Sequence, residues 1–339
     1  MYRPFHIVLS CPFADILSDT SISPIENKDT LCMVQDFEDG AWRINDFLDY
    51  IWDNVAQTAL NQAERMALGS RPSSMLVRAA KNLRITDNDI AGGEIAEILL
   101  YAIMRNYYNA LPVVPKIYYK QNVNDYAKGA DSVHIVLEPG DKFSLWLGEA
   151  KFYDSIDDTR LTSIVTSVYN TLSTDKIKKE NSIIIGINEL STLDIPDNIV
   201  LDIKKLLNKD ISIDKIKPLL HIPILILHEC NITSKATRLE ESYIKSMRDF
   251  YIDRVNSYFR FLSVCLNRLK DKLLANYLRN RGNDLATVRI SAFCVAMLSN
   301  NSFSCKYNIF FRKNELSAAI LQRRLAKKEN HSSHSQVVM

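Results

Sequence analysis

The stretch that decides the fold is residues 129–153, GADSVHIVLEPGDKFSLWLGEAKFY. Two mostly apolar runs in it surround the turn formers Glu-Pro-Gly-Asp-Lys, and alternating runs around such a turn indicate a β-hairpin. Charged residues interrupt the ends of these runs that lie away from the turn, among small neighbours that leave room for a ligand. We therefore expect the functional site on this hairpin, at Asp131, Glu149 and Lys151.

Two pairings of the hairpin are plausible. A two-residue Pro-Gly loop mixes apolar and polar side chains on both faces, whereas a three-residue Pro-Gly-Asp loop pairs Val133 with Leu147 and makes one face continuously apolar. A slip by one residue moves every side chain to the other face, so burial favours the three-residue loop. In that register Asp131 lies directly opposite Glu149.

This pairing predicts a metal site. Directly opposed side chains on antiparallel strands have Cβ atoms roughly 4.5–5.5 Å apart, and two carboxylates that close repel unless a cation lies between them. Hard oxygen ligands at this separation suit Mg²⁺ or Mn²⁺. Lys151 shares the strand face of Glu149, where its amine could orient a metal-bound water or help to deprotonate it. We expect a metal-dependent phosphodiesterase, with Asp131 and Glu149 as the metal ligands.

The acid-x-Lys triplet is not specific by itself, since it occurs at 26–28, 149–151 and 202–204. The first triplet lies in a turn-rich segment, and the third lies in an amphipathic helix, where positions i and i+2 point apart. The competing interpretation of 149–151 is an exposed salt bridge on an ordinary surface hairpin, which would contribute little energy.

The rest of the chain alternates helical and strand-like segments, which indicates an α/β fold. Residues 1–40 read as irregular structure or short strands, and residues 282–339 suggest no role. The segment Thr86-Asp87-Asn88-Asp89 supplies capping side chains before one of the helices. We expect helices at 44–68, 74–83, 95–111, 157–172, 198–207 and 235–281, and strands at 117–119, 132–137, 143–152, 182–187 and 222–228.

Composition bounds the class of protein. The chain has 339 residues with 47% hydrophobic content, enough to bury a sizeable core. No stretch reaches the roughly 18 apolar residues of a membrane span, so we expect no membrane partner and a cytoplasmic location. Residues 1–150 carry 13 Lys/Arg against 20 Asp/Glu (net −7), and residues 151–339 carry 29 against 20 (net +9). The basic half suits a polyanion such as DNA, although a basic surface is common.

The charged motifs, in their order, resemble those of the PD-(D/E)xK nucleases: a helix with Gly93–Glu97, then Gly129–Asp131, then Gly148–Lys151. More narrowly, several segments resemble the HamA/AbpA family, the nuclease subunits of Hachiman-type antiphage defence systems, over most of residues 30–230. These segments are 39–43, 93–102, 129–134 and 146–153.

The resemblance implies a site and an architecture. Asp131 and Glu149 would bind Mg²⁺ (or Mn²⁺), Lys151 would assist the attacking water, and Glu94 or Glu97 would supply a helix acid, with the choice between them open. Ala130 stands where the superfamily motif has Pro. The implied architecture is a restriction-endonuclease-like core, a mixed central sheet flanked by helices, with an N-terminal extension and a helical C-terminal region. The corresponding boundaries are 1–85 for the helical and irregular N-terminal region, 86–232 for the nuclease core, and 233–339 for the basic C-terminal region, disordered from about 329.

The resemblance also implies partners. A superfamily 2 helicase of the HamB/AbpB type would act with this chain, which has no GxxxxGK[S/T] loop of its own, and DNA would be the substrate. We expect the helicase to restrain the nuclease until aberrant DNA is sensed. Three alternatives stay open: a catalytically inactive DNA-binding or scaffold subunit, a ribonuclease, and a purely structural interaction module.

Overall fold

A seven-stranded mixed sheet forms the centre of the computed structural model, with the strand order β1-β2-β9-β8-β7-β6-β5. Strands β2, β9, β8 and β7 run parallel to one another. Strand β1 pairs antiparallel with β2 on one side, and on the other side β6 pairs antiparallel with β7 and β5 with β6. The structure describes residues 4–19, 28–83, 92–119, 129–140, 142–171, 174–186, 190, 193, 195–277 and 289–298. The strands of the sheet are β1 Phe5–Pro12, β2 Lys28–Gln35, β5 Leu111–Val114, β6 Ser132–Glu138, β7 Lys142–Tyr153, β8 Leu220–Cys230 and β9 Arg289–Leu298, and a separate pair is β3 Phe37–Glu38 with β4 Ala41–Trp42.

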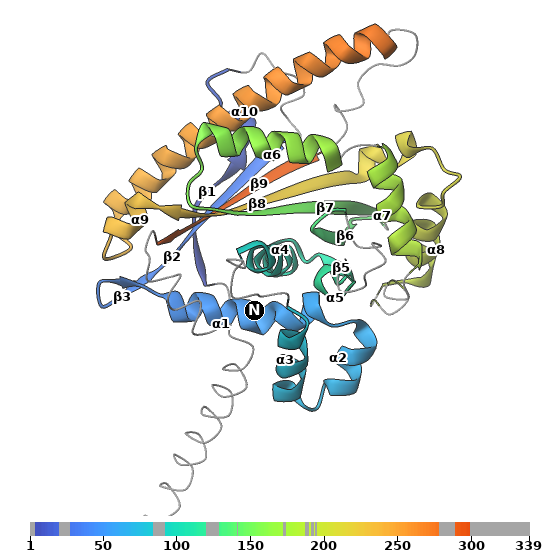
Figure 1. Ribbon diagram of the computed structural model, residues 1–339, viewed down its shortest axis with the longest axis horizontal. Helices are drawn as coiled ribbons and strands as arrows, with labels where there is room; N and C mark the ends of the chain where they lie inside the picture. Colours follow the sequence, from blue (N-terminus) through green and yellow to red (C-terminus); the bar gives the residue numbers. More distant parts are fainter. Residues whose placement is uncertain are drawn as a thin grey trace, which may run out of the picture.

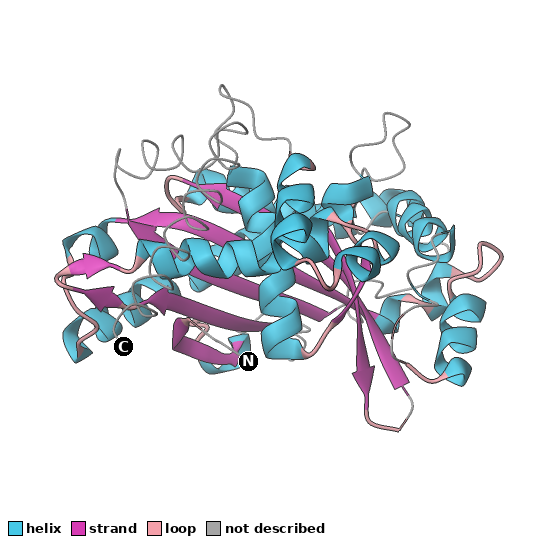
Figure 2. Cartoon of the chain, turned by 90° about the horizontal axis from the view of Figure 1, so that it is seen from below, coloured by secondary structure: helices cyan, strands magenta, loops and turns pink. Residues whose placement is uncertain are grey.

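Helices cover both faces of the sheet, as expected for the α/β class (Figure 1). The long α10 and α6 lie on one side, and α4, with α1 beyond it, lies on the other (Figure 1). The view from below shows the helices of that second side crossing the strands (Figure 2). The helices are α1 Ile44–Ala59, α2 Gln62–Leu68, α3 Pro72–Lys81, α4 Gly92–Tyr108, α5 Lys116–Tyr119, α6 Asp158–Thr171, α7 Thr174–Gly186, α8 Asp197–Leu206, α9 Asn231–Lys235 and α10 Glu241–Tyr277, with 3₁₀ turns η1 Phe13–Asp15, η3 Ile213–Lys215 and η4 Lys217–Leu219.

The two faces of β7 belong to two separate parts of the core. Leu145 and Leu147 pack into the cluster that includes residues of α6, α7 and α10, whereas Trp146 and Ala150 pack into the cluster that includes α1 and α4. Side chains alternate along a strand, so Glu149 faces the side of α6 and α7. The adjacent β8 is apolar and buried along almost its whole length, as an interior parallel strand must be.

The hairpin register is the predicted one. Ser132 pairs with Gly148 and Val133 pairs with Leu147, which is the three-residue loop and excludes the two-residue alternative. Gly140 in the turn has φ of 77°, a left-handed conformation that glycine adopts without steric penalty. The observed pairing confirms the prediction. The physical reason for this register is that only it gives the buried face an unbroken set of apolar side chains.

Two predicted strands are wrong. Residues 117–119 form helix α5, and the strand lies just before it at β5. The strand-like run at 182–187 predicts a strand, but residues 174–186 form helix α7. Ile177, Glu180 and Ile184 are buried at helical spacing, and a short apolar run does not by itself distinguish the two structures.

The sheet also draws strands from the parts of the chain expected to flank the core. Strands β1 and β2 come from residues 1–85, and β9 comes from the C-terminal region expected to be helical and lies between β2 and β8. The expected helix at 44–68 divides into α1 and α2 where Asn61 caps the second helix by accepting from the Glu64 N–H at 2.8 Å. The capping segment 86–89 and the tail from 329 lie outside the described residues.

No helix in the described part of the chain combines the length and the apolar character that crossing a membrane requires.

Candidate active site

The three residues predicted on the hairpin lie together in the structure. Lys151 Nζ donates to Glu149 Oε1 and lies 4.0 Å from Asp131 Oδ2. The side chains of Glu149, Asp131 and Lys151 are 7%, 20% and 27% exposed. The cluster is therefore partly buried, unlike the exposed salt bridge of the competing interpretation, but a ligand could still reach it from solvent.

Asp131 is held by the backbone of the neighbouring strand. Its Oδ2 accepts from the Ala150 N–H at 3.0 Å, and its own N–H donates to the Gly148 carbonyl at 2.7 Å. Both contacts involve residues adjacent to Glu149 in β7. The position of the first carboxylate is thus tied to the strand that carries the second carboxylate.

Glu149 has a second partner that the sequence did not reveal. The Ser167 hydroxyl of α6 donates to Glu149 Oε1 at 2.5 Å. Helix α6 begins soon after β7 ends and returns across the face to which Glu149 points. The only sequence signal was this connectivity, because Ser167 is one of several Ser and Thr residues in α6.

The electrostatics of the cluster keep Lys151 charged. Burial lowers the pKa of its ammonium, but the adjacent Glu149 and Asp131 carboxylates more than offset this effect, and the pKa is raised above its ordinary value. A cation thus lies between the two acids, as their proximity requires. In this state Lys151 is a hydrogen-bond donor.

The two candidate helix acids, Glu94 and Glu97, lie on α4. Helix α4 packs through Ile95 and Leu99 against the opposite side of the sheet from the side that Glu149 faces. Glu97 of this helix is buried and Glu94 is partly exposed. Among the described residues, no group of three or more His, Cys, Asp or Glu side chains is placed to hold one metal ion.

The donor set nevertheless fits a magnesium ion. Mg²⁺ in proteins is usually bound through one or two carboxylates and keeps several waters, so a third protein ligand is not required. Asp131 and Glu149 supply two carboxylates that already share one cation, the Lys151 ammonium. These two acids are the residues that could hold the metal.

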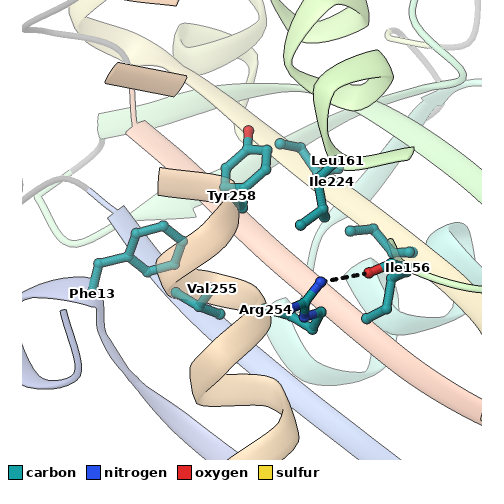
Figure 3. Close-up of a pocket in the computed structure, with 8 residues that line it drawn as sticks. Phe13, Ile156, Leu161, Ile224, Arg254, Val255 and Tyr258 are labelled. Atoms are coloured by element: carbon teal, nitrogen blue, oxygen red, sulfur yellow. Dashed lines mark hydrogen bonds between the residues drawn. The ribbon is translucent and has the colours of Figure 1, made fainter. Parts of the chain in front are cut away.

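Two other features of the described core, a small cavity and a pair of histidines, are apolar or uncharged. Figure 3 shows a cavity of about 20 Å³ between α10, α6 and β8, roughly the space of one water molecule. Its lining is apolar except for Arg254 and Tyr258, and Arg254 points to the Ile156 carbonyl, to which it donates at 3.3 Å. His134 and His228 are fully buried, and burial lowers their pKa to about 3 and about 4, so both are neutral at pH 7.

A comparison with protein families gives one match: the model described as HamA matches residues 12–273, which are 262 of the 339 residues. The matched range contains Asp131, Glu149, Lys151 and Ser167 and ends before β9. No curated protein matches the chain.

Proposed function

The chain belongs to the HamA family, and on that premise we propose that it is the nuclease of a Hachiman-type antiphage defence system, a Mg²⁺- or Mn²⁺-dependent deoxyribonuclease. The observation that carries the proposal is that the carboxylates of Asp131 and Glu149 both lie beside the Lys151 ammonium. A central mixed sheet with helices on both faces is compatible with the restriction-endonuclease-like core that we propose for it.

Each residue of the cluster has a defined part in the proposed reaction. Asp131 and Glu149 would hold the metal ion, which would supply an activated water at neutral pH and would stabilise the charge that develops on the phosphate. Lys151, as an ammonium, would orient the attacking water or bind a phosphate oxygen by donating a hydrogen bond. Help with deprotonating that water is the other role that the sequence allows for Lys151.

The surroundings of the acids favour a fixed site. Asp131 accepts from the Ala150 N–H, and Glu149 accepts from the Ser167 hydroxyl, so each carboxylate keeps a hydrogen bond from the protein when Lys151 moves away. Groups that orient metal ligands in this way typically change metal affinity or activity by 10–100-fold when removed. Both proposed ligands therefore have protein groups that would hold them in place.

The family suggests a helicase partner for the chain. A nuclease that cuts DNA without restraint would attack the host chromosome, so we propose that a superfamily 2 helicase holds this subunit inactive and releases it on aberrant DNA. Residues 151–339, with 29 Lys/Arg against 20 Asp/Glu, would contribute cations for DNA phosphates.

The test is cleavage of supercoiled plasmid and of a matched RNA, in Mg²⁺ and in EDTA, by the chain alone and with the helicase and ATP. We expect DNA cleavage that requires the metal and that appears when the helicase is activated. Cutting by the isolated chain at the full rate would contradict the restraint, and preferential cutting of RNA would contradict the substrate. No cutting under any condition, with no Mg²⁺ or Mn²⁺ binding by calorimetry, would identify Lys151, Glu149 and Asp131 as a structural ion cluster.

A further inference from the structure

A buried ion pair lies beside the start of β6, outside the three residues of the candidate active site. Lys116 Nζ of α5 is 2.7 Å from Glu180 Oε2 of α7, and the two side chains are 0% and 1% exposed. Removing two charges from water is unfavourable, and their attraction offsets this only when the geometry is good and further hydrogen bonds satisfy the remaining atoms. The second oxygen of Glu180 makes such a hydrogen bond.

Glu180 Oε1 accepts from the Ala130 N–H at 2.8 Å. Ala130 immediately precedes Asp131, so one carboxylate connects α5, α7 and the backbone that carries the first proposed metal ligand. The chain is closely fitted to this carboxylate, because a Cβ at Gly129 would lie 1.6 Å from Glu180 Oε1. Only glycine at position 129 allows this approach.

Lys116 is itself held in place by the strand before it. The Tyr101 hydroxyl of α4 donates to the Val114 carbonyl at the end of β5, two residues before Lys116. Tyr101 is almost fully buried and its ring contacts His134 of β6 with 4.4 Å between the ring centroids. The ammonium that faces Glu180 therefore projects from a segment fixed to both β6 and α4.

We infer that Glu180 is a positioning residue for Asp131, with Lys116 as the counter-ion that holds the Glu180 carboxylate in place. The inference deepens the proposed function and rests on it. Asp131 is fixed from two sides: Glu180 holds the preceding peptide, and β7 holds its N–H through Gly148 and its carboxylate through Ala150. Loss of the Glu180 acceptor lets the Asp131 carboxylate move relative to Glu149.

Two double variants separate this role from a general contribution to folding. Lys116→Met/Glu180→Gln and Lys116→Met/Glu180→Leu both remove the two buried charges, a replacement that folded proteins commonly tolerate. The two variants differ in the acceptor for the Ala130 N–H: Gln retains a side-chain oxygen at that position, and Leu does not. Both are assayed well below their thermal transitions, with the folded fraction confirmed by circular dichroism.

We expect the Leu variant to cleave DNA with kcat reduced about 10- to 100-fold and with KM for DNA within about twofold of the wild type, since small displacements of catalytic groups have effects of this size. The Gln variant should stay within about threefold of the wild type in kcat. Equal kcat values for the two folded variants would overturn the inference.

Amide hydrogen exchange gives a readout that does not depend on cleavage. The Ala150 N–H is protected by Asp131 and does not contact Glu180, so faster exchange at Ala150 in the Leu variant alone would show that Asp131 has moved. Unchanged exchange at Ala150 in the Leu variant would overturn the inference. If the wild type itself cuts no nucleic acid, the proposed function fails, and the exchange comparison still decides the positioning role.

Should the double variants not fold, Gly129→Ala provides the second comparison. The new methyl group would displace the Glu180 carboxylate while both charges remain. The same loss of kcat and faster exchange at Ala150 are expected, and wild-type values for both in the folded variant would refute the inference.

Discussion

At the scale of single residues, Lys151 and a divalent cation compete for the same carboxylate oxygens. We predict that Lys151→Met binds Mn²⁺ or Mg²⁺ at least as tightly as the wild type, because the variant removes the competing ammonium and leaves two adjacent carboxylates. Cleavage should fall about 100-fold or more, in the range seen when a donor to developing charge is removed. Calorimetric titration of the metal checks the binding, and Glu149→Gln, which removes a ligand, is the reference for lost binding. If Lys151→Met weakens metal binding as much as Glu149→Gln does, the lysine supports the metal rather than competes with it.

Ser167 offers a second residue-scale prediction. Ser167→Ala removes the hydroxyl that donates to Glu149 and should weaken metal binding or activity about tenfold, as for other groups that orient a ligand. Ser163→Ala is the matched control on the same helix, because the Ser163 hydroxyl donates to the exposed Thr159 carbonyl instead. Half-saturation of cleavage by Mg²⁺ measures the effect, and equal values for the two variants would exclude a role for the Ser167 hydroxyl.

The sequence predicted the residues that depend on local pairing and missed those that depend on helix packing. Asp131, Glu149 and Lys151 could be placed because the hairpin register follows from burial over a few residues. Ser167 and Glu180 could not, since their contacts require knowing how α6 and α7 return to the sheet, and part of α7 was expected to be a strand. The role of Glu94 or Glu97 stays a prediction, and their helix packs through Ile95 and Leu99 against the other side of the sheet.

At the scale of elements, the meeting of β6, β7, β8 and α4 depends on Gly148. A Cβ there would lie 2.1 Å from Ser132 Oγ and 2.7 Å from Leu100 Cδ2. Gly148→Ala should lower the free energy of unfolding by about 1–3 kcal/mol, the usual effect of overpacking. Gly93→Ala is the control, because a Cβ at Gly93 in α4 meets nothing within 4 Å. Urea unfolding compares the variants, and a Gly148→Ala variant as stable as Gly93→Ala would mean that the strands separate easily at this point.

The long elements with strong periodicity were predictable, and the short or distant ones were not. The hairpin strands, β8, α6 and α8 were predicted close to their observed bounds, because each has an apolar run or face of sufficient length. Helix α10 lies within the expected range 235–281 but begins at Glu241, six residues later than expected. Helix α5 has four residues, too few for a helical period to be visible. Strand β9 pairs with β2 across about 260 residues of chain, and no local pattern encodes a partner so remote.

At the scale of the whole molecule, two buried histidines couple stability to pH. His134 and His228 have a pKa of about 3 and about 4 in the folded protein, lowered by burial from 6.5, so protonation favours the unfolded chain. Above pH 6.5 both histidines are neutral in the folded and the unfolded chain, and the free energy of unfolding does not depend on them. Below pH 6.5 the unfolded chain binds protons that the folded protein does not, so the free energy of unfolding falls until the pH reaches the folded pKa of each histidine. Each histidine should steepen the pH dependence of the unfolding free energy by about 1.4 kcal/mol per pH unit between these limits.

The acid response can be assigned by substitution. His134→Leu should reduce the slope of the unfolding free energy against pH between pH 6 and 4, relative to the slope of the wild type. Urea unfolding at a series of pH values measures both slopes. A slope unaffected by His134→Leu would mean that His134 takes up its proton without unfolding.

The sheet also explains how the ends of the chain support the site. Strands β1, β2 and β9, from the two flanking regions, extend the sheet beyond β8, and β8 is the direct neighbour of β7, which carries Glu149 and Lys151. The nuclease function that we propose therefore depends on a sheet that is complete only when strands from all three regions of the chain are present.

The most direct test of the central claim is plasmid cleavage by Glu149→Gln and Glu138→Gln in Mg²⁺, under the condition in which the wild type cuts. Both substitutions neutralise one acid of the same hairpin, but Glu138 is exposed beside Ser144, near the turn, and Glu149 lies in the cluster with Lys151. The account predicts that Glu149→Gln loses cleavage by about 100-fold or more, the scale of a lost transition-state contact, while Glu138→Gln cuts like the wild type. Cleavage by Glu149→Gln at the wild-type rate would contradict it.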